Sequence, residues 1–243
     1  MPVPRPLLIT LLAAVVAAPV VPALSAPAQA GQPLAAAPSR ASTSAGAGVL
    51  GYDRLGLRRG DTWVLSNSLD GSGVRSYVEQ TSGWQPVAGD TDGDGNASVS
   101  LFKDGVWLIR DVEGGPARTI RFGLRGDQPV MGDWNGDGKD SLGLFRRGRW
   151  FIKDTLTSPY RTFGYGVSGD VAVVGDWDGN GRTDIGVRRN TTWFQRDAAN
   201  AGPTSRSFRF GNTGDRPVAG DWDHDGRDTP GVFRNGTWFL RRG

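Results

Sequence analysis

The chain has 243 residues, with 28 Lys and Arg against 25 Asp and Glu, no Cys, nine Trp and a single His, His224. The absence of Cys excludes thiol catalysis and disulfide stabilisation, and a lone His makes a Ser-His-Asp triad a poor hypothesis. Because disulfides cannot form, a bound metal ion is one remaining way to stabilise a domain of this composition.

The first 30 residues have the pattern of a signal peptide. Arg5 supplies a positive charge, residues 7–24 form an apolar run interrupted by prolines, and Ala28-Gln29-Ala30 fits a cleavage site. The prolines disfavour the alternative of a membrane anchor. Residues 31–48 are low in complexity and are predicted to be a flexible linker. We therefore predict a secreted, extracellular protein with a signal peptide at 1–30, a linker at 31–48 and a folded region at 49–243, without a membrane span once the signal is removed.

A repeat of about 44 residues dominates the folded region. Segments resembling GVFRxGxW occur five times, and their Trp residues are 44, 43, 43 and 45 positions apart at Trp63, Trp107, Trp150, Trp193 and Trp238. A PVxGD segment with a Gly/Asp loop and an FGxxGD segment recur in the same register. Such self-similarity is typical of repeat architectures.

Each repeat is predicted to contain four short strands, here called A to D. In one copy these are 129–132, 142–145, 150–152 and 161–163, which are rich in β-branched and aromatic residues and separated by turn residues. Four-stranded units at this period favour an all-β propeller of about five blades over a β-sandwich or β-solenoid. The expected blades are 49–86, 87–129, 130–172, 173–217 and 218–243.

The first and last repeats are atypical. In the first, residues 49–53 align with a strand A, but the Asp loop is missing. The last stops after strand C, so we predict an incomplete blade, and residues 37–44 are a candidate for its fourth strand.

Four loops between strands A and B carry the candidate chemistry. They begin at Asp90, Asp133, Asp176 and Asp221, and each has Asp or Asn at positions 1, 3 and 5 and Gly at position 6. Oxygen ligands on alternate residues can surround one hard cation, Gly permits the turn, and position 7 can offer its backbone carbonyl. Close-packed carboxylates also repel one another unless a cation lies among them.

The loops are not EF-hands. An EF-hand needs a bidentate Glu at position 12, where these loops have Leu101, Leu144, Val187 and Val232 in predicted strands. Coordination is instead expected to end at position 9. The candidate metal-coordinating residues are Asp90, Asp92, Asp94, Asn96 and Ser98 in the first loop, Asp133, Asn135, Asp137, Lys139 and Ser141 in the second, Asp176, Asp178, Asn180, Arg182 and Asp184 in the third, and Asp221, Asp223, Asp225, Arg227 and Thr229 in the fourth.

The repeats resemble the FG-GAP or VCBS repeats of bacterial secreted proteins and of the integrin α-subunit propeller. The resemblance depends on Phe-Gly at 122–123 and 210–211, the Gly-Asp that follows, and the four Asp loops, and it covers about residues 49–243. It implies up to four Ca²⁺ ions, one in each hairpin between strands A and B, held by the Asp and Asn side chains at positions 1, 3 and 5 and by Asp184. The second loop has the fewest carboxylates and is expected to bind most weakly.

The functional expectation is a calcium-binding, non-catalytic module that binds or scaffolds a protein or a cell-surface or cell-wall glycan, and not a specific nucleic acid. The alternatives are a lectin with Trp-lined sites, for which Trp134, Trp177 and Trp222 are candidates, and, with less support, a glycan-active hydrolase. The Trp residues of strand C are expected to pack in the core. Core packing is also the simpler expectation for the three loop Trp residues. No recognisable catalytic group supports an enzyme, although propellers host both enzymes and binders.

Overall fold

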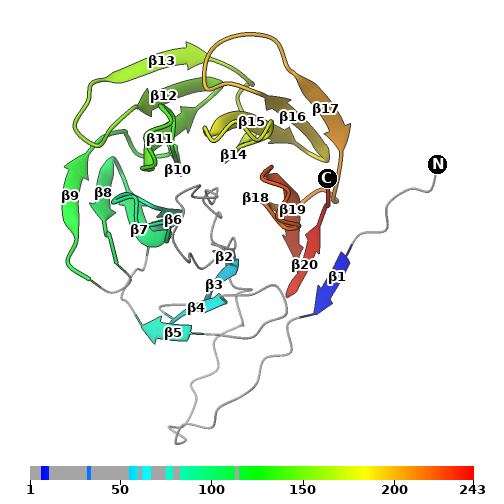
Figure 1. Ribbon diagram of the computed structural model, residues 1–243, viewed down its shortest axis with the longest axis horizontal. Helices are drawn as coiled ribbons and strands as arrows, with labels where there is room; N and C mark the ends of the chain where they lie inside the picture. The colour runs from blue at the N-terminus through cyan, green and yellow to red at the C-terminus, as the bar shows by residue number, and fades with distance from the viewer. Residues whose placement is uncertain are drawn as a thin grey trace, which may run out of the picture.

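The computed structural model describes residues 83–112 and 115–243, together with the backbone of the strand segments 7–10, 32–33, 55–59, 62–66 and 75–78. The strands form five four-stranded antiparallel sheets, which Figure 1 shows arranged in a ring. The predicted all-β propeller is therefore confirmed. The described residues contain no α-helix, and so none that is long and apolar enough to cross a membrane.

The second, third and fourth blades each take four consecutive strands, in the predicted order A to D. The second consists of β6 (Gln85–Gly89), β7 (Ser98–Lys103), β8 (Val106–Ile109) and β9 (Arg118–Arg121). The third consists of β10 (Gln128–Gly132), β11 (Ser141–Arg146), β12 (Arg149–Lys153) and β13 (Tyr160–Gly164). The fourth consists of β14 (Val171–Gly175), β15 (Asp184–Arg189), β16 (Thr192–Arg196) and β17 (Arg206–Arg209). Each strand A thus begins two residues before the blade boundary expected from the sequence.

The first and fifth blades are assembled differently from the prediction. The first contains β2 (Gln32–Pro33), β3 (Leu55–Arg59), β4 (Thr62–Ser66) and β5 (Arg75–Val78), so its strand A comes from the expected linker. The fifth contains β18 (Arg216–Gly220), β19 (Thr229–Arg234) and β20 (Thr237–Leu240), and its fourth strand is β1 (Leu7–Thr10), antiparallel to β20. Residues 37–44 and 49–53, expected as strands in these blades, lie outside the described residues. Cleavage after Ala30 would remove β1 and leave β20 as an edge strand.

In the second to fifth blades, the hydrophobic core lies between neighbouring sheets. One cluster joins Trp107 and Phe102 of the second blade to Leu142 and Leu144 of the third. Equivalent clusters join the third blade to the fourth and the fourth to the fifth. The strand C residues Trp107, Trp150, Trp193 and Trp238 are at most 1% exposed, as expected for core residues.

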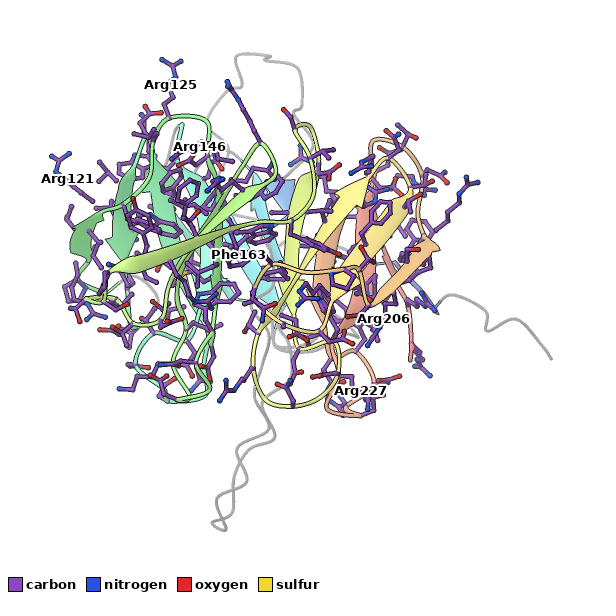
Figure 2. All side chains as sticks on the ribbon, turned by 90° about the horizontal axis from the view of Figure 1, so that it is seen from above. Arg121, Arg125, Arg146, Phe163, Arg206 and Arg227 are labelled. Carbon is purple, nitrogen blue, oxygen red and sulfur yellow. The ribbon has the colours of Figure 1, made fainter. Side chains whose placement is uncertain are left out.

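Strand direction gives the propeller two distinct ends. In the third blade, Gly132 pairs with Ser141 at one end of the β10–β11 hairpin, and Gln128 pairs with Phe145 at the other. The four Asp loops, between strands A and B, therefore share one end, which we call the metal-loop end. The turns between strands B and C and the loops from strand D to the next strand A share the opposite end. Figure 2 shows Arg227, from the fourth loop, at the first end, and Arg125 and Arg146 at the second.

Candidate metal sites

The loop backbone is organised around the carboxylate at position 1. In the first loop, Asp90 Oδ1 accepts a hydrogen bond from Gly93 N at 2.7 Å and Asp90 Oδ2 accepts one from Gly95 N at 2.8 Å. Asp133 in the second loop and Asp176 in the third accept the same pair of bonds, and Asp221 in the fourth accepts one from Gly226 N at 3.0 Å. Each loop is therefore wrapped around its first carboxylate by its own amides.

Hydrogen bonds from loop amides also orient the side-chain oxygen at position 5. The side-chain oxygen at position 5 accepts the amide hydrogen of position 7 in all four loops, with N···O distances of 2.7 to 2.9 Å. Each of these bonds fixes one side-chain oxygen at position 5. In the first and fourth loops, this carboxylate has a ligand atom within 4.8 Å of those of positions 1 and 3.

Three of the four loops bring three carboxylates together. The ligand atoms of each cluster lie within 4.8 Å of one another, and the clusters are Asp90, Asp92 and Asp94; Asp176, Asp178 and Asp184; and Asp221, Asp223 and Asp225. In the second loop, Asn135 takes the place of one carboxylate and its Nδ2 donates to Asp137 Oδ2 at 2.9 Å. The second loop thus has the least negative charge, as its sequence indicates.

Burial and repulsion from neighbouring carboxylates raise the pKa values of three acids in the first and third loops. Burial raises the pKa of Asp184 to about 8, and the charges of Asp178 and Asp176 act in the same direction. Burial also raises the pKa of Asp90 and of Asp176, each against the hydrogen bonds that it accepts from loop amides. A cation at the centre of such a cluster would favour the ionised carboxylates and reverse the direction of the shift.

The position 9 side chains do not all point to the same partners. Asp184 joins its carboxylate cluster and accepts a hydrogen bond from Trp177 N at 3.1 Å. The hydroxyls of Ser98 and Thr229 donate instead to the carbonyl oxygens of Asp111 and Arg241, at 2.8 and 2.5 Å. Ser141 is 1% exposed and its Oγ has no hydrogen-bond partner among the described residues.

The structure reveals a role for position 8 that the sequence reasoning missed. Asp140, Thr183 and Asp228 are buried, and each holds position 1 of the preceding loop. Thr183 Oγ1 accepts from Asp133 N at 2.9 Å, while Thr183 N donates to Asp133 O at 2.8 Å. Asp140 makes the same pair of bonds to Asp90, and Asp228 makes it to Asp176. Neighbouring Asp loops are therefore joined by hydrogen bonds between the backbone of position 1 in one loop and position 8 in the next.

This link leaves a trace in the sequence. Position 8 is polar in the three loops that follow another Asp loop, and it is Ala97 in the first loop, which follows the repeat without one. A polar side chain is needed at position 8 only where a preceding Asp loop is present to form a hydrogen bond with it.

Position 4 shows the same dependence on the neighbouring blade. A Cβ at Gly93, Gly136 or Gly179 would lie 2.9–3.2 Å from the position 7 side chain of the next loop, and these glycines also have positive φ angles. In the fourth loop this position is His224, with φ of 61° and an exposed side chain. Its repeat is followed in the ring by the first repeat, whose sequence has no Asp loop and therefore no position 7 residue of this kind.

The residues at these sites fit a calcium ion. Asp223 Oδ1 is buried and has no hydrogen-bond partner among the described residues, and such an orphaned oxygen is unfavourable unless a cation coordinates it. The donors are carboxylate, amide and backbone oxygens, without sulfur or imidazole, which is the set that hard cations prefer. Asp223 with Asp221 and Asp225 would hold the ion in the fourth loop.

The loop tryptophans do not form an exposed aromatic surface. Trp134, Trp177 and Trp222 are at most 4% exposed, and their indole N–H groups donate to strand B carbonyls at 2.9 to 3.2 Å. They pack beneath the loops, so the Trp-lined sugar sites considered from the sequence are not provided by these three residues.

An aromatic pocket of about 450 Å³ lies instead at the boundary of the second and third blades. Tyr160 is 55% exposed there, and its ring centroid lies 5.7 Å from that of Phe122 and 5.8 Å from that of Phe151. Asp104, Arg121 and Lys153 supply charged groups to the same lining. Aromatic faces beside a few polar groups are the usual composition of a small-molecule site.

The fold and the loops define a class of protein, a β-propeller with acidic loops at one end. No family model matches the chain, and no curated protein matches it either. Among solved structures, a similar one is that of a lectin from Agrocybe aegerita, determined for its specific recognition of non-reducing terminal N-acetylglucosamine. The two share 14% sequence identity with a TM-score of 0.46, and the alignment covers 87% of this chain. The chain spans 62% of the length of that lectin.

Proposed function

We propose that the protein is a secreted, calcium-stabilised propeller that acts as a non-catalytic binding module for a cell-surface glycan or a protein. The observation that carries the proposal is the convergence of three carboxylates to within 4.8 Å in each of three equivalent loops. The resemblance to FG-GAP or VCBS repeats supports the same assignment. Bound ions would neutralise the loops and stabilise the links between blades.

The candidate surface for a glycan is the pocket beside Tyr160. An exposed aromatic ring can stack on a sugar, and the adjacent Asp104 and Arg121 can form hydrogen bonds with hydroxyl groups. A second pocket, of about 350 Å³, is lined by residues 212–216 and 233–235 of the fifth blade. Each of these two described pockets has one carboxylate, Asp104 or Asp215, whereas glycoside hydrolysis ordinarily uses a pair. A binding function therefore has more support than a hydrolytic one.

Calcium binding is tested by thermal unfolding in excess calcium and in excess chelator. Extracellular calcium modules have dissociation constants of about 10⁻⁴ to 10⁻³ M, so ~10 mM calcium should stabilise the fold by about 1–3 kcal/mol per occupied site. Asp176→Asn with Asp178→Asn should reduce this gain. Asp104→Asn, at the opposite end, serves as the matched control. Equal melting temperatures in calcium and chelator would contradict the proposal.

Glycan binding is tested separately, with an array of glycans and cell-wall preparations in calcium. We expect Tyr160→Ala to abolish the strongest signals while leaving the melting temperature in calcium nearly unchanged. Val112→Ala, at another exposed apolar position, should bind like the unaltered chain. Binding that survives Tyr160→Ala would assign the glycan to another surface, and a blank array would favour a protein partner.

A further inference from the structure

The end of the propeller opposite the metal loops has a strongly basic surface. Strand register places six exposed arginines there, at the starts and ends of strands or in the turns between them: Arg121, Arg125, Arg147, Arg149, Arg209 and Arg216. None of them forms an ion pair with a carboxylate of the described residues. Figure 2 shows Arg121 and Arg125 projecting away from the body of the protein near this end.

The described carboxylates at this end do little to offset that charge. Asp127, Asp170 and Asp215 are buried, and each is paired in a bidentate manner with an arginine of its own blade, namely Arg146, Arg189 or Arg234. In the part of the chain that the structure describes, this leaves Asp104 as the exposed carboxylate of this end. Excess positive charge on one face attracts an anionic partner.

Exposed apolar side chains lie on the same end. Leu124 is 59% exposed, Val167 49% and Val171 40%. Leu124 and Val167 occupy the same position of two successive loops between strand D and strand A, directly after the Phe-Gly and Tyr-Gly motifs. Single exposed apolar residues are ordinary, but three on one basic face need a partner that also takes up apolar groups.

Hydrogen bonds within each loop, and from a neighbouring arginine, hold the loops that present these side chains. Leu124 N donates to Asp127 Oδ2 at 2.8 Å, Asp127 N donates to Leu124 O at 3.3 Å, and Arg146 holds the carboxylate from the other side. Val167 and Asp170 repeat the arrangement. Because the tips are already ordered, burying Leu124 and Val167 against a partner would require little further loss of conformational entropy.

We propose that this end docks peripherally on an anionic lipid bilayer. Apolar tips surrounded by arginines suit the boundary between acyl chains and charged headgroups. A soluble polyanion would satisfy the arginines but not the apolar tips. The proposal goes beyond the calcium-stabilised binding module, and it concerns the end that does not carry the metal loops.

The test is partitioning of the full chain onto vesicles of phosphatidylcholine, with and without phosphatidylglycerol, at low and physiological ionic strength. We expect binding only when phosphatidylglycerol is present. Each Arg→Glu change should weaken it at least five-fold, since one basic residue near an anionic surface contributes about 1 kcal/mol. Leu124→Ser with Val167→Ser should weaken it about ten-fold or more. The apolar segment 7–24 is common to all variants, so differences between them report on this end alone.

Matched controls come from the metal-loop end. Arg125→Glu with Arg216→Glu is compared with Arg242→Glu, and the apolar double variant is compared with Val112→Ser. Both control positions are exposed, and the controls should bind like the unaltered chain, with all melting temperatures recorded in calcium. The proposal is overturned if phosphatidylglycerol vesicles are not bound at low ionic strength. It is also overturned if the apolar variant binds normally while dextran sulfate displaces the protein completely, because the partner is then a soluble polyanion.

Discussion

Replacing Thr183 with Val tests whether neighbouring metal loops are coupled. Valine fills the space of both γ atoms but cannot accept the hydrogen bond from Asp133 N, which is 2.9 Å long and buried. Thr183 is 3% exposed, so water cannot readily replace the hydroxyl. Loss of a buried hydrogen bond with one partner left behind destabilises a protein by about 1–3 kcal/mol. For a domain of this size that corresponds to a fall in melting temperature of roughly 2–4 °C per kcal/mol.

We expect a second effect of Thr183→Val, because this hydrogen bond joins two different loops. Thr183 belongs to the third loop, but it holds Asp133, which is position 1 of the second loop. If that link pre-orders the second loop, Thr183→Val should also reduce the calcium-dependent rise in melting temperature. The assay is therefore urea and thermal unfolding in excess calcium and in excess chelator. Thr192→Val, on β16 at the opposite end, is the control and should change stability by less than about 0.5 kcal/mol.

Two results would refute this reasoning. Unchanged stability of Thr183→Val in both conditions would mean that the hydrogen bond contributes nothing measurable. An equal loss in calcium and in chelator would mean that the link stabilises the ring but has no influence on the metal loop beside it.

Three further predictions follow from single contacts. Gly132→Ala should destabilise the fold by about 1–3 kcal/mol in urea unfolding, because the added Cβ would lie 2.4 Å from Thr183 Cγ2 in the next blade; wild-type stability would contradict this packing. Asn135→Asp should enlarge the calcium-dependent rise in melting temperature, since it gives the second loop a third carboxylate, and should lower stability in chelator; the opposite signs would argue against a cation there. Burial acts to raise the pKa of Asp215, but hydrogen bonds from Arg234 and from its own loop hold it below the ordinary 3.8. Its ionised form therefore stabilises the fold above about pH 4, and that contribution is lost as the pH falls through the lower folded-state value. Asp215→Asn should lower stability at neutral pH and flatten the acid side of a pH–stability curve, and an unchanged curve would contradict the assignment.

The sequence predicted the structural features that are determined within a single repeat. Alternating β-branched and aromatic residues located strands A to D, and the Asp spacing located the loops, because both patterns are set by contacts within about 45 residues. It could not assign the role of Thr183 or Asp228, since the atoms that they hold are 50 and 52 residues away. A loop that is read alone gives no reason for a polar residue at position 8. Comparison between loops could have supplied one, because Ala97 is the exception where no Asp loop precedes.

Ring closure was the other part that sequence could not determine. Residues 37–44 are a candidate for the last strand by position, although their small residues give little support for a strand, and β1 takes that place in the structure. Strand pairing is chosen by register and by the edge that is free, and neither quantity is visible in a low-complexity segment. The repeats in the sequence therefore predicted the number of blades better than they predicted which segment supplies the last strand of the fifth blade.

Two kinds of hydrogen-bonded link join the second to fifth blades. Indole N–H groups of Trp107, Trp150 and Trp193 each donate to the carbonyl of the loop that starts the next blade, at 2.9 to 3.1 Å. The equivalent group of Trp238 is buried without a partner among the described residues. The chain of links between Asp loops also ends at the fourth loop, because the first repeat has no loop to continue it. Each added link between blades raises the cooperativity of a repeat array, so the second to fifth blades, which these links join, are expected to unfold together as one cooperative unit.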